Sequence, residues 1–338
     1  MAIQSVGDQA RAFALQIASR RLKLSLATLT KEMATGESAD IASRLQGNTR
    51  VLSGIEMRIA AIGQFKRNAA DASILSKGVQ DLLEGIRNDT KSLGTDLISD
   101  PFLMENMEVG TRATQIRNAF ESVIARLNGA VAGRFMMGGL ATDVPPVAAA
   151  SEILDRLSAA TSGLSTAADV AQVVSDWFDA PPGSGGYLDQ AYFGTLGSPQ
   201  RIQIGEETTI ALSTSAASPE IREVLKGLAM AALLDRGVLS TDVNQGATLL
   251  RASGQTISEA DRGLIGEVGR VGLTQQFTDQ ASRSNDAALS VLSLTRNEMR
   301  SVDPFETTAA LTEVESQLEA LYAVTARLSK LKLVEFLR

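Results

Sequence analysis

Apolar side chains recur at intervals of three and four residues along the last segment of the chain. This spacing places them on one stripe of a helix. The stripe contains Leu311, Val314, Leu318, Leu321, Val324, Leu328 and Leu331. An isolated helix is only marginally stable in water, so the stripe predicts a second helix that covers it.

The first segment, residues 9–33, has the same pattern and is the predicted partner. Its apolar stripe contains Leu15, Ala18, Leu22, Leu26, Leu29 and Met33. Its polar face is basic (Arg11, Arg20, Arg21, Lys23, Lys31), whereas the first half of the C-terminal helix is acidic (Glu306, Glu313, Glu315, Glu319). Opposite charges would favour pairing of the two helices, although each exposed ion pair contributes only a few tenths of a kcal/mol. The alternative is that both polar faces are simply solvated.

From these two stripes we predict an assembly interface, with faces left over for neighbouring molecules. Its predicted residues are Leu15, Leu22, Leu26, Leu29, Leu311, Val314, Leu318, Leu321, Leu328 and Leu331.

Between the terminal segments, the pattern predicts further helices and one hairpin. A break at Thr35 and Gly36 precedes a very long helix with apolar positions from Val51 to Leu93, which a turn in "SDPF" (99–102) ends. Helices are expected at 104–131, 148–160, 166–179 and 258–299, with another that begins at Pro219 and faces Ile221, Leu225 and Leu228 inward. The alternation in "QRIQIGEETTIAL" predicts a hairpin with its turn at 205–207.

The expected fold is therefore mainly α: an elongated antiparallel helical bundle or coiled coil formed by the N- and C-terminal arms, with a small inserted α+β module. We expect three domains: a terminal coiled-coil assembly region (1–45 and 302–338), a helical rod (46–138 and 257–301) and the inserted module (139–256).

Composition and charge exclude several functions. The net charge of −7 argues against a nucleic-acid partner, because such binding depends on Lys and Arg that neutralise phosphates. No apolar run is long enough to span a membrane, and no cleavable signal peptide is recognisable at the N-terminus. The chain has no Cys and no His, which removes thiolate nucleophiles and the commonest general base and metal ligand. We predict no catalytic residues, no metal and no cofactor.

Two weaker patterns have structural explanations. Ser329 and Lys332 fit the Ser-x-x-Lys spacing of some hydrolases, but a terminal helix offers no pocket for a catalytic serine. Gly263, Gly266, Gly269 and Gly272 recur every three residues. They predict a small-residue helix face that another backbone approaches closely, or a hinge.

Three stretches carry a family resemblance. They are "LTKEMATGESADI", with Thr35 and Gly36; "LNGAVAGRFMMGG", with Asn128, Gly133, Arg134, Phe135 and Gly138; and the ending "LEALYAVTARLSKLKLVEFLR". In these the chain resembles the flagellin superfamily and, within it, the hook-filament junction proteins.

The resemblance implies a structural, non-enzymatic subunit of the bacterial flagellum. Such a subunit would be secreted by type III export without a cleaved signal, would form the junction between hook and filament outside the cell, and would serve motility. Its implied partners are copies of itself, another hook-associated protein, flagellin, and an export chaperone on the C-terminal helix. The alternatives are filament flagellin itself, a cytoplasmic coiled-coil adaptor and, last, an enzyme.

Overall fold

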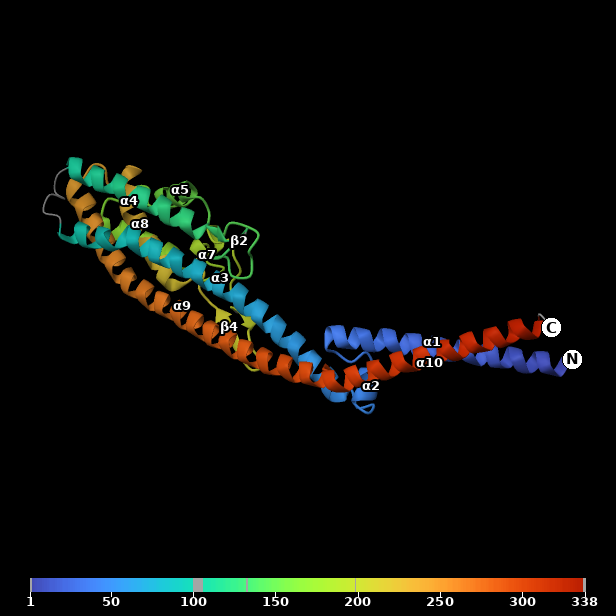
Figure 1. The fold of residues 1–338 in the computed structure, drawn as a ribbon. Coiled ribbons are helices and arrows are strands. Elements are labelled where there is room, and N and C mark those ends of the chain that lie inside the picture. The colour runs from blue at the N-terminus through green and yellow to red at the C-terminus, as the bar shows by residue number, and fades with distance from the viewer. Residues whose placement is uncertain (1, 100–105, 132, 198, 337–338) are drawn as a thin grey trace. The chain divides into compact units, whose positions relative to one another are not determined.

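The computed structural model describes residues 2–99, 106–131, 133–197 and 199–336, with side chains between residues 9 and 328. Over these residues the chain forms ten helices and two small antiparallel sheets of two strands each (Figure 1). It divides into two compact units: unit 1 is Met1–Gly63 with Ala287–Arg338, and unit 2 is Gln64–Asp286. The predicted mainly α fold with a small β component is confirmed. The expected division into three domains stays a prediction, and residues 139–256 all lie in unit 2.

Unit 1 contains the terminal helices and the ends of two longer ones. Its elements are α1 (Ala2–Thr35), the short α2 (Ile41–Arg44), the first part of α3 (Arg50–Ser99), the last part of α9 (Val243–Arg300) and α10 (Pro304–Phe336). As the sequence predicts, α1 ends at Gly36, whose φ of 71° suits a residue without a Cβ atom.

The segment that follows α1 is hydrogen-bonded to the segment that precedes α10. The amide of Ser38 donates to the carbonyl of Arg300 (2.8 Å), and the amide of Val302 donates to the carbonyl of Gly36 (3.0 Å). The Arg300 guanidinium also pairs with Glu37, at 2.9 Å. The backbone groups that the helix ends leave free are thus used to join the two segments.

The start of α10 is fixed by its own capping residue. Asp303 Oδ1 accepts hydrogen bonds from the amides of Phe305 (2.8 Å) and Glu306 (3.4 Å), and Pro304 is the first residue of the helix. A carboxylate at this position satisfies free amides and complements the helix dipole. Residues 301–303 therefore separate α9 from α10. The turn predicted in "SDPF" lies mostly outside the described residues.

Unit 2 is organised around a helix buried on nearly all sides. This helix, α8 (Pro219–Asp235), contacts α4 (Asn106–Leu127), α5 (Ala150–Ala160) and α6 (Ala167–Asp179). Every residue in 224–233 is buried. The sequence predicts Ile221, Leu225 and Leu228 as one inward face; these are buried, but so are the other faces. The alanines and Gly227 of this segment allow neighbouring helices to approach from several directions.

A lysine lies within the buried part of α8. The Lys226 ammonium is 2.7 Å from a carboxylate oxygen of Asp179 and 2.8 Å from one of Glu223. Burial disfavours the charged ammonium, but hydrogen bonds to the two carboxylates outweigh it and raise the pKa of Lys226. The two carboxylates therefore keep a charge in the buried segment 224–233 of α8, whose other residues are apolar.

Two hairpins complete unit 2, together with the short α7 (Tyr187–Gln190). In the predicted hairpin, β3 (Gln200–Gln203) pairs with β4 (Thr209–Leu212), and Ile202 lies opposite Ile210. The amide side chains of Asn68 on α3 and Asn285 on α9 donate to the carbonyls of Gln203 (2.7 Å) and Ile204 (2.8 Å). The hairpin is thus attached to both long helices.

Two element boundaries differ clearly from the prediction. The helix expected at 104–131 is α4 and ends at Leu127, because a second hairpin follows, β1 (Ala130–Val131) with β2 (Arg134–Phe135). The helix expected at 258–299 is the C-terminal part of α9, which begins at Val243 rather than at Ser258. The start of α9 is set by Asp242, whose carboxylate accepts from the amides of Asn244 (2.9 Å) and Gln245 (3.2 Å).

Glycines on α9 decide how closely neighbouring parts of the chain can pack against this helix. A Cβ atom on Gly254 would lie 2.8 Å from Leu97 Cβ and 2.9 Å from the carbonyl oxygen of Gly94, so α3 and α9 touch backbone to backbone there. In the glycine series predicted as a close-approach face, only Gly263 has a neighbour, the side chain of Glu220 at 3.1 Å. A Cβ atom on Gly266, Gly269 or Gly272 would have nothing within 4 Å, so no described residue of this chain packs on them.

Replacement by alanine should have opposite effects on the free energy of unfolding at a closely packed glycine and at an exposed one. We expect Gly254→Ala to lower the free energy of unfolding by about 1 to 3 kcal/mol, because the added methyl group overpacks the crossing of α3 and α9. We expect Gly269→Ala to raise it by about 0.5 to 1 kcal/mol, because alanine favours the helix and meets nothing. Urea unfolding followed by the fluorescence of Trp177, the one tryptophan of the chain, reports on unit 2. Equal effects of the two substitutions would contradict this packing.

Candidate assembly interface on the terminal helices

Helices α1 and α10 lie side by side and run in opposite directions (Figure 1). Thr308 near the start of α10 hydrogen-bonds the sulfur of Met33 near the end of α1, at 3.6 Å. Further along, the Lys23 ammonium lies 5.8 Å from the centre of the Tyr322 ring. The helices are 34 and 33 residues long. The terminal segments therefore pair within one chain, as their apolar stripes predict.

The predicted interface residues mostly occupy the seam between these helices. Leu15, Leu22, Leu26 and Leu29 on α1 are half-buried, as are Leu311, Val314 and Leu321 on α10. Leu318 is buried, with 7% of its surface exposed, whereas 37% of Leu328 is exposed. The side chain of Leu331 lies outside the described residues. Their role in assembly stays a prediction.

The seam covers little apolar surface for its length. Among the described side chains of α1 and α10, Leu318 is the only large apolar one that is buried; Thr307 is buried as well. Two helices alone can each cover only one side of the other. A seam of this kind gains much less from burial than the core of unit 2.

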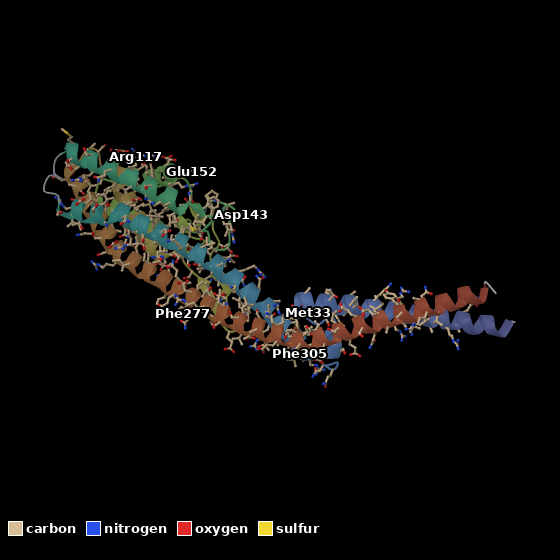
Figure 2. All side chains as sticks on the ribbon, viewed as in Figure 1. Met33, Arg117, Asp143, Glu152, Phe277 and Phe305 are labelled. Carbon is tan, nitrogen blue, oxygen red and sulfur yellow. The ribbon has the colours of Figure 1, made fainter. Side chains whose placement is uncertain are left out.

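A second set of apolar side chains on the pair faces solvent. On α1, Phe13 is 65% exposed and Leu24 is 62% exposed, with Ile17 between them at helical spacing. On α10, Tyr322 and Val324 are about half exposed. Phe305, labelled in Figure 2, is 85% exposed at the start of α10. Large apolar surfaces of this kind mark interaction sites.

A groove of about 650 Å³ lies along the two helices near their free ends. Its apolar lining includes Leu15, Leu24, Leu321 and Leu328, and its basic lining Arg11, Arg20 and Lys23. An apolar groove with basic groups along it is suited to an amphipathic helix whose polar side is acidic.

The charges of the two helices do not pair within the chain. Within the described side chains, no ion pair joins the basic residues of α1 to the acidic residues of α10. Lys23 instead lies over the Tyr322 ring. Charge attraction therefore does not set the register of the pair, and both sets of charges stay available for another molecule.

The residues of "LNGAVAGRFMMGG" fix the backbone of a hairpin and its neighbouring loops in unit 2. The Asn128 side chain both donates to the carbonyl of Val147 (2.8 Å) and accepts from its amide (2.9 Å). Gly133, with φ of 76°, lies in the turn between β1 and β2, and the half-buried Phe135 donates its amide to Thr142. A Cβ atom on Gly138 would lie 2.2 Å from the carbonyl oxygen of Ala141. Asn128, Gly133 and Gly138 therefore shape the loops, while Arg134 is exposed on β2.

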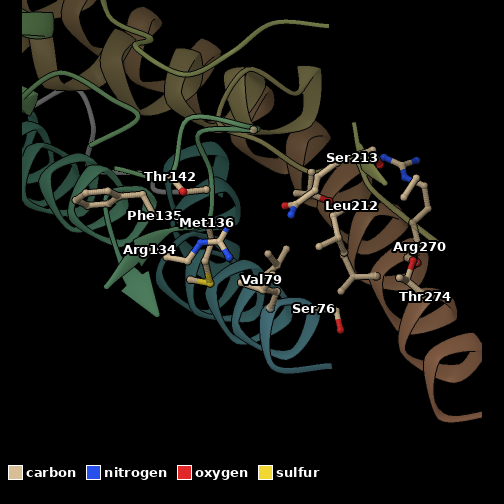
Figure 3. A pocket seen from close by; sticks show the side chains of 16 residues that line it. Ser76, Val79, Arg134, Phe135, Met136, Thr142, Leu212, Ser213, Arg270 and Thr274 are labelled. Atoms are coloured by element: carbon tan, nitrogen blue, oxygen red, sulfur yellow. The ribbon is translucent and has the colours of Figure 1, made fainter. Parts of the chain in front are cut away.

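Unit 2 also contains a small cavity, shown in Figure 3. It measures about 50 Å³ and lies between the two hairpins and helices α3 and α9, with Arg134 and Arg270 in its lining. This volume suits a few water molecules rather than a metabolite-sized ligand. Ser329 and Lys332 of the hydrolase-like spacing lie outside the described side chains.

Within the described residues, two further kinds of site are absent. No cluster of three or more acidic side chains there is arranged to hold a metal ion. None of the helices there combines the length and the apolarity that crossing a bilayer requires.

Comparison with known proteins identifies the fold. No protein-family model matches the chain, and no curated protein sequence matches it. A structure assigned to a flagellar hook-associated protein of Vibrio parahaemolyticus superimposes with a TM-score of 0.52 at 13% identity, over 74% of this chain and 96% of that one. The chain shares the fold of this hook-associated protein. FlgL of Bacillus cereus aligns over 71% of this chain and 96% of its own, with a TM-score of 0.49 and 12% identity.

Truncation of the buried leucine in the seam should loosen the terminal pair. We expect Leu318→Ala to destabilise the pairing of α1 with α10 by about 2 kcal/mol or more, because the best-covered side chain of the seam is lost. Trypsin should then cleave after Arg20 and Arg21 several times faster, as followed by mass spectrometry. Val324→Ala on the same helix is the matched control, because Val324 is 48% exposed, and it should leave the rate nearly unchanged. Equal rates for the two variants would rule out Leu318 as the centre of the seam.

Proposed function

We propose that this protein is a structural subunit of the bacterial flagellum that self-assembles through its terminal helices at the junction between hook and filament. The observation that carries the proposal is the incomplete seam of α1 and α10, which buries one large leucine and leaves a second apolar face in solvent. The fold shared with a hook-associated protein and the junction-protein resemblance of the sequence support the flagellar assignment.

Self-assembly would provide the cover that the terminal pair lacks. A third helix from a neighbouring copy could lie along Phe13, Ile17 and Leu24 and fill the groove beside Leu328. Each apolar Å² removed from water contributes about 25 cal/mol, which over two long helices can offset the entropy of ordering them. Terminal helices that are only partly covered in one chain would then become fully packed in the assembly.

The charges indicate which surface a neighbouring copy would offer. The groove is flanked by Arg11, Arg20 and Lys23 of α1, and the acidic residues Glu313, Glu315 and Glu319 lie on α10. A basic α1 of one copy beside an acidic α10 of the next would satisfy both sets. Repetition of this head-to-tail contact gives helical symmetry rather than a closed dimer.

The remaining parts of the proposal rest on the family resemblance. The subunit would be secreted by type III export without a cleaved signal, with a chaperone covering the α10 stripe before export. Outside the cell its neighbours would be copies of itself, another hook-associated protein and flagellin. Its role would be structural rather than enzymatic. Filament flagellin is the alternative: loss of the gene would then remove filaments entirely, whereas loss of a junction subunit would leave them short or unattached.

A charge placed in the groove should prevent assembly without unfolding the chain. We expect Leu328→Asp to abolish sedimentable assemblies, because a carboxylate would have to be buried beside a neighbouring apolar face. Ala320→Asp adds the same charge to α10 at an exposed position outside the groove and should assemble normally. Analytical ultracentrifugation measures assembly, and Trp177 fluorescence checks that unit 2 is folded. Deletion of residues 325–338 should act like Leu328→Asp; normal assembly of that truncated chain would refute the role of the stripe.

Exchanging charges between copies should distinguish contacts between chains from contacts within one chain. A double variant Arg20→Glu with Lys23→Glu, and another with Glu315→Lys and Glu319→Lys, should each assemble poorly because like charges meet across the interface. An equimolar mixture should assemble again, since each variant offers the charge that the other needs. Raised salt should reduce the difference between mixed and separate samples. Failure of the mixture, with recovery only when all four changes are in one chain, would locate the contact within the chain.

A further inference from the structure

A second apolar surface lies on unit 2, along the outer side of α9. Ile265, Leu273 and Phe277 are 50%, 55% and 57% exposed, and their spacing of eight and four residues places them near one another on the helix. Gly266 and Gly269 lie among them with nothing within 4 Å. The surface, called the α9 face below, is a shallow strip without side chains, bordered by large apolar ones.

Another exposed apolar surface is formed by two paired loops of unit 2, residues 138–147 and 192–197. Backbone hydrogen bonds hold the loops together, from Thr195 to Gly138 (2.9 Å) and from Phe193 to Pro146 (2.8 Å). The surface, called the loop edge below, exposes 40% to 60% of Leu140, Val144, Phe193 and Leu196. Because the backbone is fixed by these bonds, its apolar side chains are presented at little further cost in entropy.

A contact between the two surfaces would bring large side chains to open space and opposite charges together. Large side chains of the loop edge can enter the strip that the glycines leave open on the α9 face. Asp143 is exposed on the loop edge, and Arg262 and Arg283 are exposed at the two ends of the α9 face. None of these three charges has an ion-pair or hydrogen-bond partner within the described residues.

One chain cannot bring these surfaces together. Figure 2 shows Asp143 and Phe277 on opposite sides of unit 2. A surface on one side that fits a different surface on the other is a heterologous contact, which continues from copy to copy into a ring or a helical filament rather than a two-fold dimer.

We propose that the loop edge of one copy packs on the α9 face of the next, with Asp143 facing Arg262 or Arg283. This inference rests on the proposed self-assembly and adds a second contact in unit 2, separate from the terminal helices. The partner is therefore a second copy of this chain. Gly266 and Gly269, which have nothing within 4 Å among the described residues, would be covered by the neighbour's loops.

Cysteine crosslinking can test the contact directly, because the chain has no cysteine of its own. Single cysteines would be placed on the loop edge (Leu140, Phe193 or Leu196) in one sample and on the α9 face (Ile265, Gly269 or Leu273) in another. A disulfide needs Cα atoms about 4.4 to 6.8 Å apart, so only true neighbours crosslink efficiently. After mild oxidation of assembled full-length mixtures, we expect at least one loop-α9 combination to give a covalent dimer, and the corresponding double variant to give a ladder. Ser151→Cys, at an exposed position on α5, is the control for random encounters.

Filling the strip gives an independent test. We expect Gly269→Trp to reduce association about ten-fold or more, because the indole occupies the space that the neighbouring loop needs. Gly269→Ala should associate much more like the unmodified chain, and circular dichroism should show both variants folded. If Gly269→Trp associates as strongly as Gly269→Ala, the α9 face is not a contact between copies.

The outcomes separate this contact from the proposed function. If the chain assembles but no loop-α9 combination crosslinks above the Ser151 control, the contact in unit 2 is refuted and the terminal-helix proposal stands. If the unmodified chain does not associate at any concentration tested, both are contradicted.

Discussion

The requirement that an apolar helix face be covered decides the structure of both units. In unit 2 the requirement is met within the chain, because α8 is covered by α4, α5 and α6 and all residues in 224–233 are buried. In unit 1 it is met only in part, because α1 and α10 pack on each other and, among their described side chains, Leu318 is the one large apolar residue that is buried. The contrast predicts a stable body and a pair of helices that is completed by other molecules.

Polar groups in unit 1 fix the ends of its helices rather than the seam between them. The backbone at Gly36 and Ser38 bonds to that at Arg300 and Val302, and Asp303 caps α10. Along the seam, by contrast, no ion pair joins the two helices within the described side chains. Hydrogen bonds therefore fix the pair where α1 ends and α10 begins. Toward the other end, the pair is held by half-buried apolar contacts. An interface that must accept a neighbouring helix benefits from this arrangement, since less intramolecular packing has to be disrupted.

Glycine has opposite roles at different positions along α9. Gly254 allows the backbone of α3 to approach, and a methyl group there would collide with Leu97 and with Gly94. Gly266, Gly269 and Gly272 face empty space, where glycine weakens the helix and gains no packing within the chain. A residue that is costly in a single copy is understandable if the space beside it is used in the assembly. The same reasoning applies to the exposed leucines and phenylalanines of the loop edge and α9.

The sequence alone determined the helices, the pairing of the termini and one hairpin, because these depend on local spacing. Apolar positions at three and four residues predicted α1, α3 and α10, Gly36 marked the end of α1, and alternation located β3 and β4. For the candidate interface, the sequence identified the stripe of the seam and predicted further faces for neighbouring molecules, but it did not identify the residues of those faces or the groove. The tertiary structure decided that α8 is buried on every side, that α9 begins at Val243, and that Asn128 holds the backbone of Val147. It also decided which glycines lie against a neighbour. These features depend on which segments distant in sequence come together, and a periodic pattern shows that a face must be covered without showing what covers it.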